Sequence, residues 1–183
     1  VIARVGLLVA LVTRDPGPEA HVLADEAIAL AYDICGAGER SMANRAVGLL
    51  ALAEGDARRA VPALDEALAI ARAAPSLVVE EMIIAALAEA HGLAGDPVTA
   101  RALADEAVAI ARGLGTANYE LIGLIALARI LLAGPAPAAA RQHVESALTR
   151  ARAVLAADGV GLYRPDIDRL TADLARLGAE ETP

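Results

Sequence analysis

Paired acidic residues are the most conspicuous candidates for chemistry in this sequence. Asp25-Glu26, Asp65-Glu66 and Asp105-Glu106 are separated by 40 residues each. Two carboxylates can share acid and base roles only when both face one substrate. Adjacent residues of a helix diverge by about 100° around its axis, so the members of a pair do not converge on one point. A catalytic pair would also not need three copies, and we interpret the pairs as a solvated helix face.

The other reactive side chains form no catalytic or metal-binding pattern. His21, His91 and His143 are far apart in the sequence, with no cysteine or carboxylate at metal-ligand spacing. Gly113-Leu114-Gly115 follows a predicted helix and lacks the lysine of a phosphate-binding loop. Cys35 is the single cysteine, which excludes an internal disulfide and is typical of a small buried thiol. We therefore expect no enzyme activity, no cofactor and no metal.

Composition and charge limit the classes of partner that the chain is expected to bind. The 183 residues carry 16 basic side chains, all arginine, spread among 24 acidic ones, for a net charge of −8. A nucleic-acid binder normally has a basic face, so we expect no direct nucleic-acid binding. No convincing apolar segment reaches the ~20 residues of a membrane-spanning helix, so we expect no membrane contact. The lone cysteine is compatible with a reducing compartment, and we expect a cytoplasmic protein.

Glycine, proline and aspartate divide the chain into helical segments. Gly55 and Gly95 supply left-handed residues that close helices, and Asp56 and Asp96 cap the helices that follow. Ser76 is the predicted cap of a further helix. The predicted helices span residues 1–13, 19–34, 39–53, 57–72, 77–93, 97–112, from Thr116 or Asn118 to 133, 138–157 and 166–177. The sequence gives no signal for a strand.

Small residues recur with the same 40-residue period as the acidic pairs. They fall at two positions in each copy, occupied by Ala20, Ala60, Ala100 and Ala140, and by Ala27, Ala67, Ala107 and Ala147. A period of two helices is typical of an α-solenoid. One helical hairpin cannot bury its apolar face alone, whereas stacked hairpins share a continuous core. We expect the alanines to be sites of close helix contact.

These spacings resemble those of the tetratricopeptide repeat (TPR) family. That family has a large and then a small residue on the first helix, as in Val47-Gly48, Leu87-Ala88 and Leu127-Ala128. Further small residues follow 12 and 19 positions later, where the alanines lie. The resemblance covers nearly the whole chain. Two features depart from the family: the period is 40 residues and not 34, and the family's aromatic positions hold residues such as Asn44 and Ile84.

The longer repeat is similar to arrays in bacterial maltose-regulator and LuxR-type signalling ATPase regulators. The resemblance implies an all-α fold, an α-solenoid forming a right-handed superhelix of four helical hairpins plus a C-terminal capping helix. We expect one domain over 1–178 and a frayed tail at 179–183. The repeats span approximately 1–36, 37–75, 76–115 and 116–158, and the capping helix spans 164–178. Because the chain begins with Val1 and not Met, we also expect it to be a fragment of a larger regulator.

The resemblance also places a binding surface on the concave side, which is lined by the first helix of each repeat. By register the lining comprises Met42, Arg45 and Leu49, then Met82, Ala85 and Glu89, then Ile122, Ile125 and Arg129. Methionine adapts to varied partners, and the two arginines are candidates for holding a carboxylate. An alternative is that these residues contact neighbouring repeats or only solvent.

Two functions therefore remain open at the level of sequence. The first is a non-catalytic interaction or effector-sensing module of a signalling or transcriptional regulator. Its partner would be a protein or peptide, such as a neighbouring ATPase, cyclase or DNA-binding domain of the same chain, or a small effector. The alternative is a self-association scaffold that mediates homodimerisation.

Overall fold

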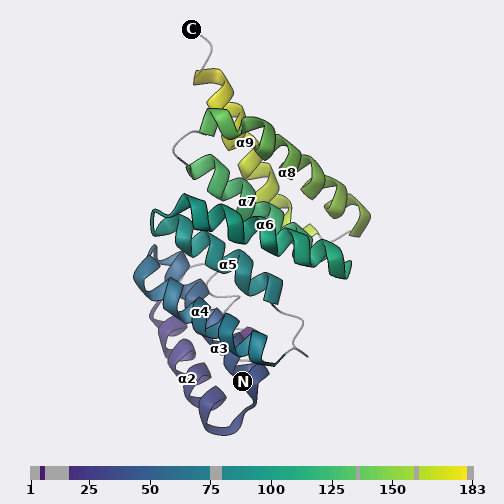
Figure 1. The fold of residues 1–183 in the computed structure, drawn as a ribbon. Coiled ribbons are helices and arrows are strands. Elements are labelled where there is room, and N and C mark those ends of the chain that lie inside the picture. Colours follow the sequence, from purple (N-terminus) through teal and green to yellow (C-terminus); the bar gives the residue numbers. More distant parts are fainter. Residues whose placement is uncertain (1–4, 7–16, 75–79, 135–136, 159–160, 181–183) are drawn as a thin grey trace.

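The computed structural model is a stack of helices running from α2 at one end to α9 at the other (Figure 1). It describes residues 5–6, 17–74, 80–134, 137–158 and 161–180, and every regular element within them is helical. The elements are α2 (Pro18–Ile34), α3 (Ala37–Ala53), α4 (Ala57–Ala73), α5 (Glu80–Leu93), α6 (Pro97–Leu114), α7 (Ala117–Ala133), α8 (Pro137–Asp158), η1 (Gly161–Tyr163) and α9 (Arg164–Glu180). The chain is thus an all-α solenoid.

The turns between paired helices are built as their sequences predict. Gly55 and Gly95 have φ angles of 75° and 84°, a left-handed conformation that glycine adopts without a steric penalty. The Asp56 carboxylate accepts a hydrogen bond from the backbone N–H of Arg59, and Asp96 does the same for Thr99. Each turn therefore closes one helix and caps the next.

Several helix ends differ from the predicted ones. α3 begins at Ala37, before the predicted Glu39, and α6 continues through Gly113 to Leu114. Thr116 occupies the N-cap position of α7, but its hydroxyl donates to the carbonyl of Ala111 and caps nothing. The predicted cap Ser76, and most of the predicted helix 1–13, lie outside the described residues. α9 extends to Glu180, and residues 181–183 are also outside the described part.

The helices lie in two layers. α3 pairs with α4, α5 with α6 and α7 with α8, and each hairpin packs on the next through α4 with α5 and α6 with α7. In the described chain, α3, α5, α7 and α9 also pack against one another in succession, whereas the backbones of α4, α6 and α8 lie farther from one another. We call the first set the inner layer. Its closer spacing places it on the shorter side of the stack.

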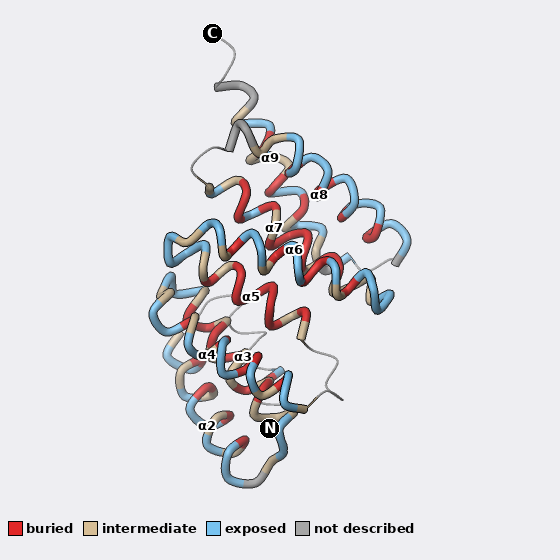
Figure 2. Tube along the Cα trace, in the orientation of Figure 1, coloured by how far each residue is buried: buried red, intermediate tan, exposed pale blue. Residues whose placement is uncertain are grey.

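The core runs along the stack between the layers (Figure 2). α5 and α7 are apolar around much of their circumference, and neighbouring helices bury them from several sides. The alanines of the repeat are buried except Ala140, which is half-buried: Ala27, Ala67 and Ala107 are fully enclosed. This confirms their predicted role as close contacts. Gly123 is also a site of close helix contact, because a Cβ there would lie 3.2 Å from the backbone nitrogen of Val108.

Ion pairs join one repeat to the next. Arg72 near the end of α4 binds Glu80 on α5 at 2.7 Å and Glu106 on α6 at 2.9 Å. Arg72 lies seven residues, or two helical turns, after Asp65 and so shares its helix face, but the structure pairs Arg72 with the following repeat. The acidic pairs are exposed, as predicted. The glutamates of two pairs also contact the preceding repeat: Glu66 accepts a hydrogen bond from Tyr32, and Glu106 accepts one from Arg72.

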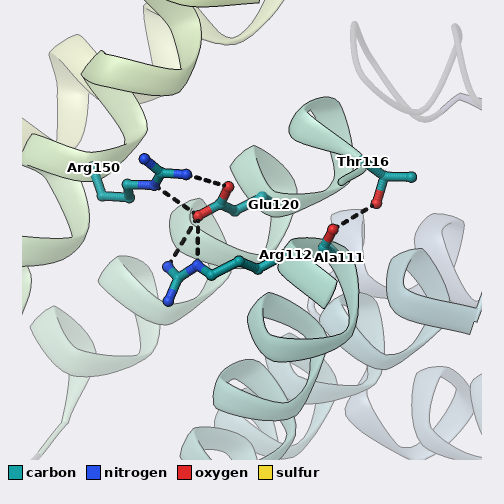
Figure 3. Close-up of polar contacts among 5 residues, drawn as sticks. All are labelled: Ala111, Arg112, Thr116, Glu120 and Arg150. Carbon is teal, nitrogen blue, oxygen red and sulfur yellow. Dashed lines mark hydrogen bonds and ion pairs between the residues drawn. The ribbon is translucent and has the colours of Figure 1, made fainter. Parts of the chain in front are cut away.

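The contact equivalent to Arg72–Glu80 in the next repeat, between Arg112 and Glu120, is buried (Figure 3). Glu120 on α7 is only 4% exposed and lies between two arginines from the flanking helices. Arg112 donates twice to its Oε1, at 3.1 and 2.9 Å, while Arg150 binds both carboxylate oxygens, at 2.8 and 2.9 Å. The hydrogen bonds from Arg150 and then Arg112 hold the pKa of Glu120 below its usual range, although burial opposes this. Glu120 thereby ties α6, α7 and α8 together.

Candidate binding surface on the inner layer

The predicted surface residues divide between the surface and the core. Met42, Leu49, Met82 and Ile122 are half-buried, so part of each apolar side chain reaches the surface of the inner layer. Ala85 and Ile125, which the register placed on the same face, are instead buried, at 1% and 4% exposed. Close packing of α5 against α7 accounts for this difference. The apolar part of the surface is therefore narrower than the register implied.

Arg129 and Glu89 are engaged with each other. Arg129 on α7 binds Glu89 on α5 at 2.9 Å and Asp166 on α9 at 2.7 Å. Burial opposes the charge of Arg129, but these two carboxylates outweigh it and raise the arginine's pKa. Arg129 was expected to be available for a partner's carboxylate. It holds two carboxylates of its own chain, and it links three helices of the inner layer.

Arg45 has a different environment. No described residue forms an ion pair with it, and its Nε–H is buried without a hydrogen-bond partner. Burial lowers the pKa of Arg45, and the titratable groups that oppose this are Tyr163 and Tyr119, both uncharged phenols near neutral pH. Arg45 therefore keeps an uncompensated positive charge on the inner layer. Of the two predicted arginines, it is the one that can serve an anionic partner.

Three residues near Arg45 were not predicted. Asn118 and Tyr119 belong to the first turn of α7, and Tyr163 ends η1. Burial raises the pKa of Tyr163, and the neighbouring Arg45 and Asn118 oppose this rise. A signal was present in the composition, because the chain has only three tyrosines and two of them lie here. We call Arg45, Asn118, Tyr119 and Tyr163 the Arg45 cluster.

A cleft of about 430 Å³ lies between α7 and α9. Its lining combines leucines with charged groups: Arg129, Leu132, Ala133, Leu170, Asp173, Arg176 and Leu177. Both arginines are engaged with carboxylates, Arg129 as described and Arg176 with Asp173. The cleft extends the inner surface toward the C-terminal end of the stack, but its own charges are already balanced.

The remaining candidate groups are dispersed. Across the described ranges, no three histidine, cysteine or carboxylate side chains come close enough to hold a metal ion. His21 lies against Glu54 at 2.6 Å, and His91 lies 3.9 Å from Asp96. In the same part of the chain, no helix is long and apolar enough to cross a membrane. The arrangement of the inner layer fits binding, with half-buried apolar groups and, in Arg45, an arginine that forms no ion pair with the described residues.

Comparison with known proteins supports the architecture. No protein-family model and no curated protein sequence matches this chain. Its fold is similar to a crystal structure of nearly identical TPR-like repeats from a kinesin light chain-like protein of Podosopora anserina. The TM-score is 0.64 at 17% sequence identity, and the match covers 98% of this chain and 95% of the other. At this identity the likeness concerns the fold, so the described helices form a TPR-like repeat array.

Proposed function

We propose that this chain is a non-catalytic interaction module whose inner layer binds a peptide or protein partner. The observation that carries the proposal is that four apolar side chains which the register places on one face, Met42, Leu49, Met82 and Ile122, are only half-buried. Flexible methionine side chains suit a helical or extended peptide laid across a groove. TPR-like arrays are a fold that offers such a surface.

The wider context is also part of this proposal. The 40-residue repeat is similar to arrays in bacterial maltose-regulator and LuxR-type signalling ATPases, so we place the chain in a cytoplasmic signalling or transcriptional regulator. Its partner is then a neighbouring ATPase, cyclase or DNA-binding domain. The sequence of the flanking segments tests this. If none of these modules lies beside the repeats, the regulator assignment is contradicted.

The binding surface itself can be tested with a random peptide library selected on the immobilised chain. Synthetic copies of the enriched peptides are then measured by fluorescence anisotropy. We expect Met82→Glu to weaken binding at least ~10-fold, about 1.4 kcal/mol, because it places a charge in the apolar row. Val98→Glu is the matched control, since Val98 is 79% exposed on α6 in the other layer.

Two results would contradict the proposed surface. One is a selection that enriches no peptide, and the other is equal binding to the Met82→Glu variant and the wild-type chain. Sedimentation at several concentrations addresses self-association, the competing interpretation of the same apolar row. We expect a monomer, and a dimer that Met82→Glu dissociates would assign the row to self-association instead.

A further inference from the structure

The cleft of about 430 Å³ lies between the C-terminal halves of α7 and α9. Leu170 on α9 is a buried part of its lining, at 4% exposed, whereas Leu132 on α7 and Leu177 on α9 are only half-buried. An apolar cavity of about 150 Å³ can hold one benzene ring, so this cleft has room for two side chains of that size. Space and apolar surface are therefore available for more than one side chain of a partner.

The ion pairs that border the cleft contain more carboxylates than arginines. Each lining arginine is already balanced, because Arg129 binds Glu89 and Asp166, and Arg176 binds Asp173. Three carboxylates against two guanidinium groups leave one negative charge in excess. The three carboxylate side chains are 30%, 35% and 34% exposed, so a partner can reach them. A cationic group is therefore the one that this border lacks.

The end of α7 adds to the negative potential of the cleft. α7 ends at Ala133, which lines the cleft. The last carbonyl groups of a helix lack intrahelical partners and carry the negative end of its dipole. In α7, all of which is described, the last turn contains no basic residue that would offset this charge. A cation in the cleft is thus attracted by the carboxylates and by the helix end.

We propose that the cleft binds a cationic amphipathic helix of a partner protein. This inference rests on the proposed use of the inner layer for binding, and it names the chemistry of the partner. Two large aliphatic side chains, about one turn apart on one face of that helix, enter the cleft and cover Leu132, Leu170 and Leu177. A lysine or arginine on the same face binds the carboxylate of Asp166 or Asp173.

Charge separates this partner from the alternatives. An acidic helix would face the excess carboxylates, and the two arginines could bind it only by releasing their present partners. A purely apolar ligand would cover the leucines but would leave the excess negative charge without a partner. The chain as a whole carries a net charge of −8, which also favours the approach of a cationic partner.

Fluorescence anisotropy with labelled synthetic helices tests the partner class. The parent peptide carries a pair of leucines one turn apart and a pair of lysines on the same face, in a background of alanine and glutamine. Its companions replace the lysines by glutamines, the lysines by glutamates, or the leucines by serines. We expect the parent to bind at least ~10-fold more tightly than the glutamate and serine peptides, with the glutamine peptide in between. The affinity of the parent should fall as salt is added.

Two results with these peptides would overturn the proposal. Equal binding of the lysine and glutamine peptides would mean that apolar contact alone fills the cleft. No binding by the lysine peptide would mean that the cleft is not a site for a cationic helix.

Matched variants assign the contacts on this chain. Asp173→Asn removes a carboxylate that lines the cleft, and Asp168→Asn makes the same change in charge at an exposed residue of the same helix. Only Asp173→Asn should weaken binding of the lysine peptide, several-fold. Leu177→Ser should weaken it at least ~10-fold. Leu114→Ser, at a residue that is 58% exposed at the end of α6, should leave it unchanged.

Equal affinities within each pair of folded variants would refute the cleft as the site. If Leu177→Ser does not fold, Leu132→Ser makes the same test from α7. Peptides selected from the library would still lose affinity in Met82→Glu if only the cleft were wrong. A library without Met82-dependent peptides would instead contradict the proposed surface, so the two failures can be told apart.

Discussion

The Glu120 carboxylate offers the sharpest test of how the repeats are held together. In Glu120→Gln the side chain keeps its size but loses its charge, and one oxygen becomes an N–H₂ group that faces guanidinium donors. Glu120 is 4% exposed and accepts hydrogen bonds from both Arg112 and Arg150. The variant therefore removes a counter-ion that lies in the core and serves two cations.

The expected cost follows from the exposure of the partners. A hydrogen bond to a charged group contributes about 1.5–3 kcal/mol net. Arg112 and Arg150 are 57% and 50% exposed, so both can return to solvent when the carboxylate is lost. We therefore expect Glu120→Gln to lower the free energy of unfolding by about 2–3 kcal/mol, rather than the larger loss of a fully buried pair. That corresponds to roughly 4–12 °C in Tm for a domain of this size.

Glu80→Gln is the matched control, because Glu80 occupies the same position one repeat earlier. Its contact with Arg72 is solvent-exposed, with 34% and 50% of the two side chains accessible. Exposed pairs contribute about 0–1 kcal/mol, so this variant should be nearly neutral. Equal losses from Glu80→Gln and Glu120→Gln in urea denaturation would refute the assignment of a buried tie at Glu120.

The difference in stability between the wild type and the Glu120→Gln variant should also depend on pH. The folded-state pKa of Glu120 is depressed by Arg150 and Arg112, so the carboxylate stabilises the fold above its unfolded pKa of about 4.3. That contribution is lost as the pH falls from this value through the lower folded pKa. The free-energy gap between wild type and Glu120→Gln should therefore be constant above about pH 5 and narrow below pH 4.3. A gap that does not change with pH would contradict the ion pair.

Three further predictions concern helix contacts. Gly123→Ala should destabilise the chain by about 1–3 kcal/mol, because the new Cβ would lie 2.9 Å from Cγ2 of Val108 and 3.2 Å from its backbone nitrogen. Gly92→Ala should instead stabilise the chain by about 0.4–1 kcal/mol, since its new Cβ meets only ordinary contacts at 3.6 Å and beyond. Chemical denaturation measures both changes. Stability changes of the same sign in the two variants would contradict the close helix contact assigned to Gly123. Ala107→Trp should cost about 1–3 kcal/mol or more by overpacking a fully buried site, and an unchanged thermal melt would contradict the repeat register.

The local parts of the fold could be predicted because their causes are local. Gly55 needs a positive φ and Asp56 needs a free backbone N–H to accept from, and both conditions are met within four residues of the chain. The buried alanines were also predictable, because a constant period requires the same steric allowance in every repeat. The start of α3 was placed too late because Cys35 already follows the end of α2 and Gly36 is the N-cap of α3, so Ala37 and Gly38 join the next helix.

The partners of charged groups were predicted less well. Arg72 and Asp65 share a helix face, which made their pairing plausible, but the neighbouring helix supplies Glu80 at 2.7 Å. Side-chain pairing depends on the angle and spacing of the next hairpin, and neither is encoded within one helix. For the same reason Arg45 and Arg129 looked equivalent in register, while Glu89 and Asp166 neutralise only one of them.

The sequence by itself determined the repeat, its turns, the small contact residues and the all-helical class of this protein. Those features follow from backbone conformation and close packing, which a 40-residue period reports directly. Only the tertiary structure decided that Glu89 and Asp166 bind Arg129, while Arg45 forms no ion pair with the described residues. Those ion pairs join neighbouring helices, whose placement depends on small rotations between repeats that no single stretch of sequence contains.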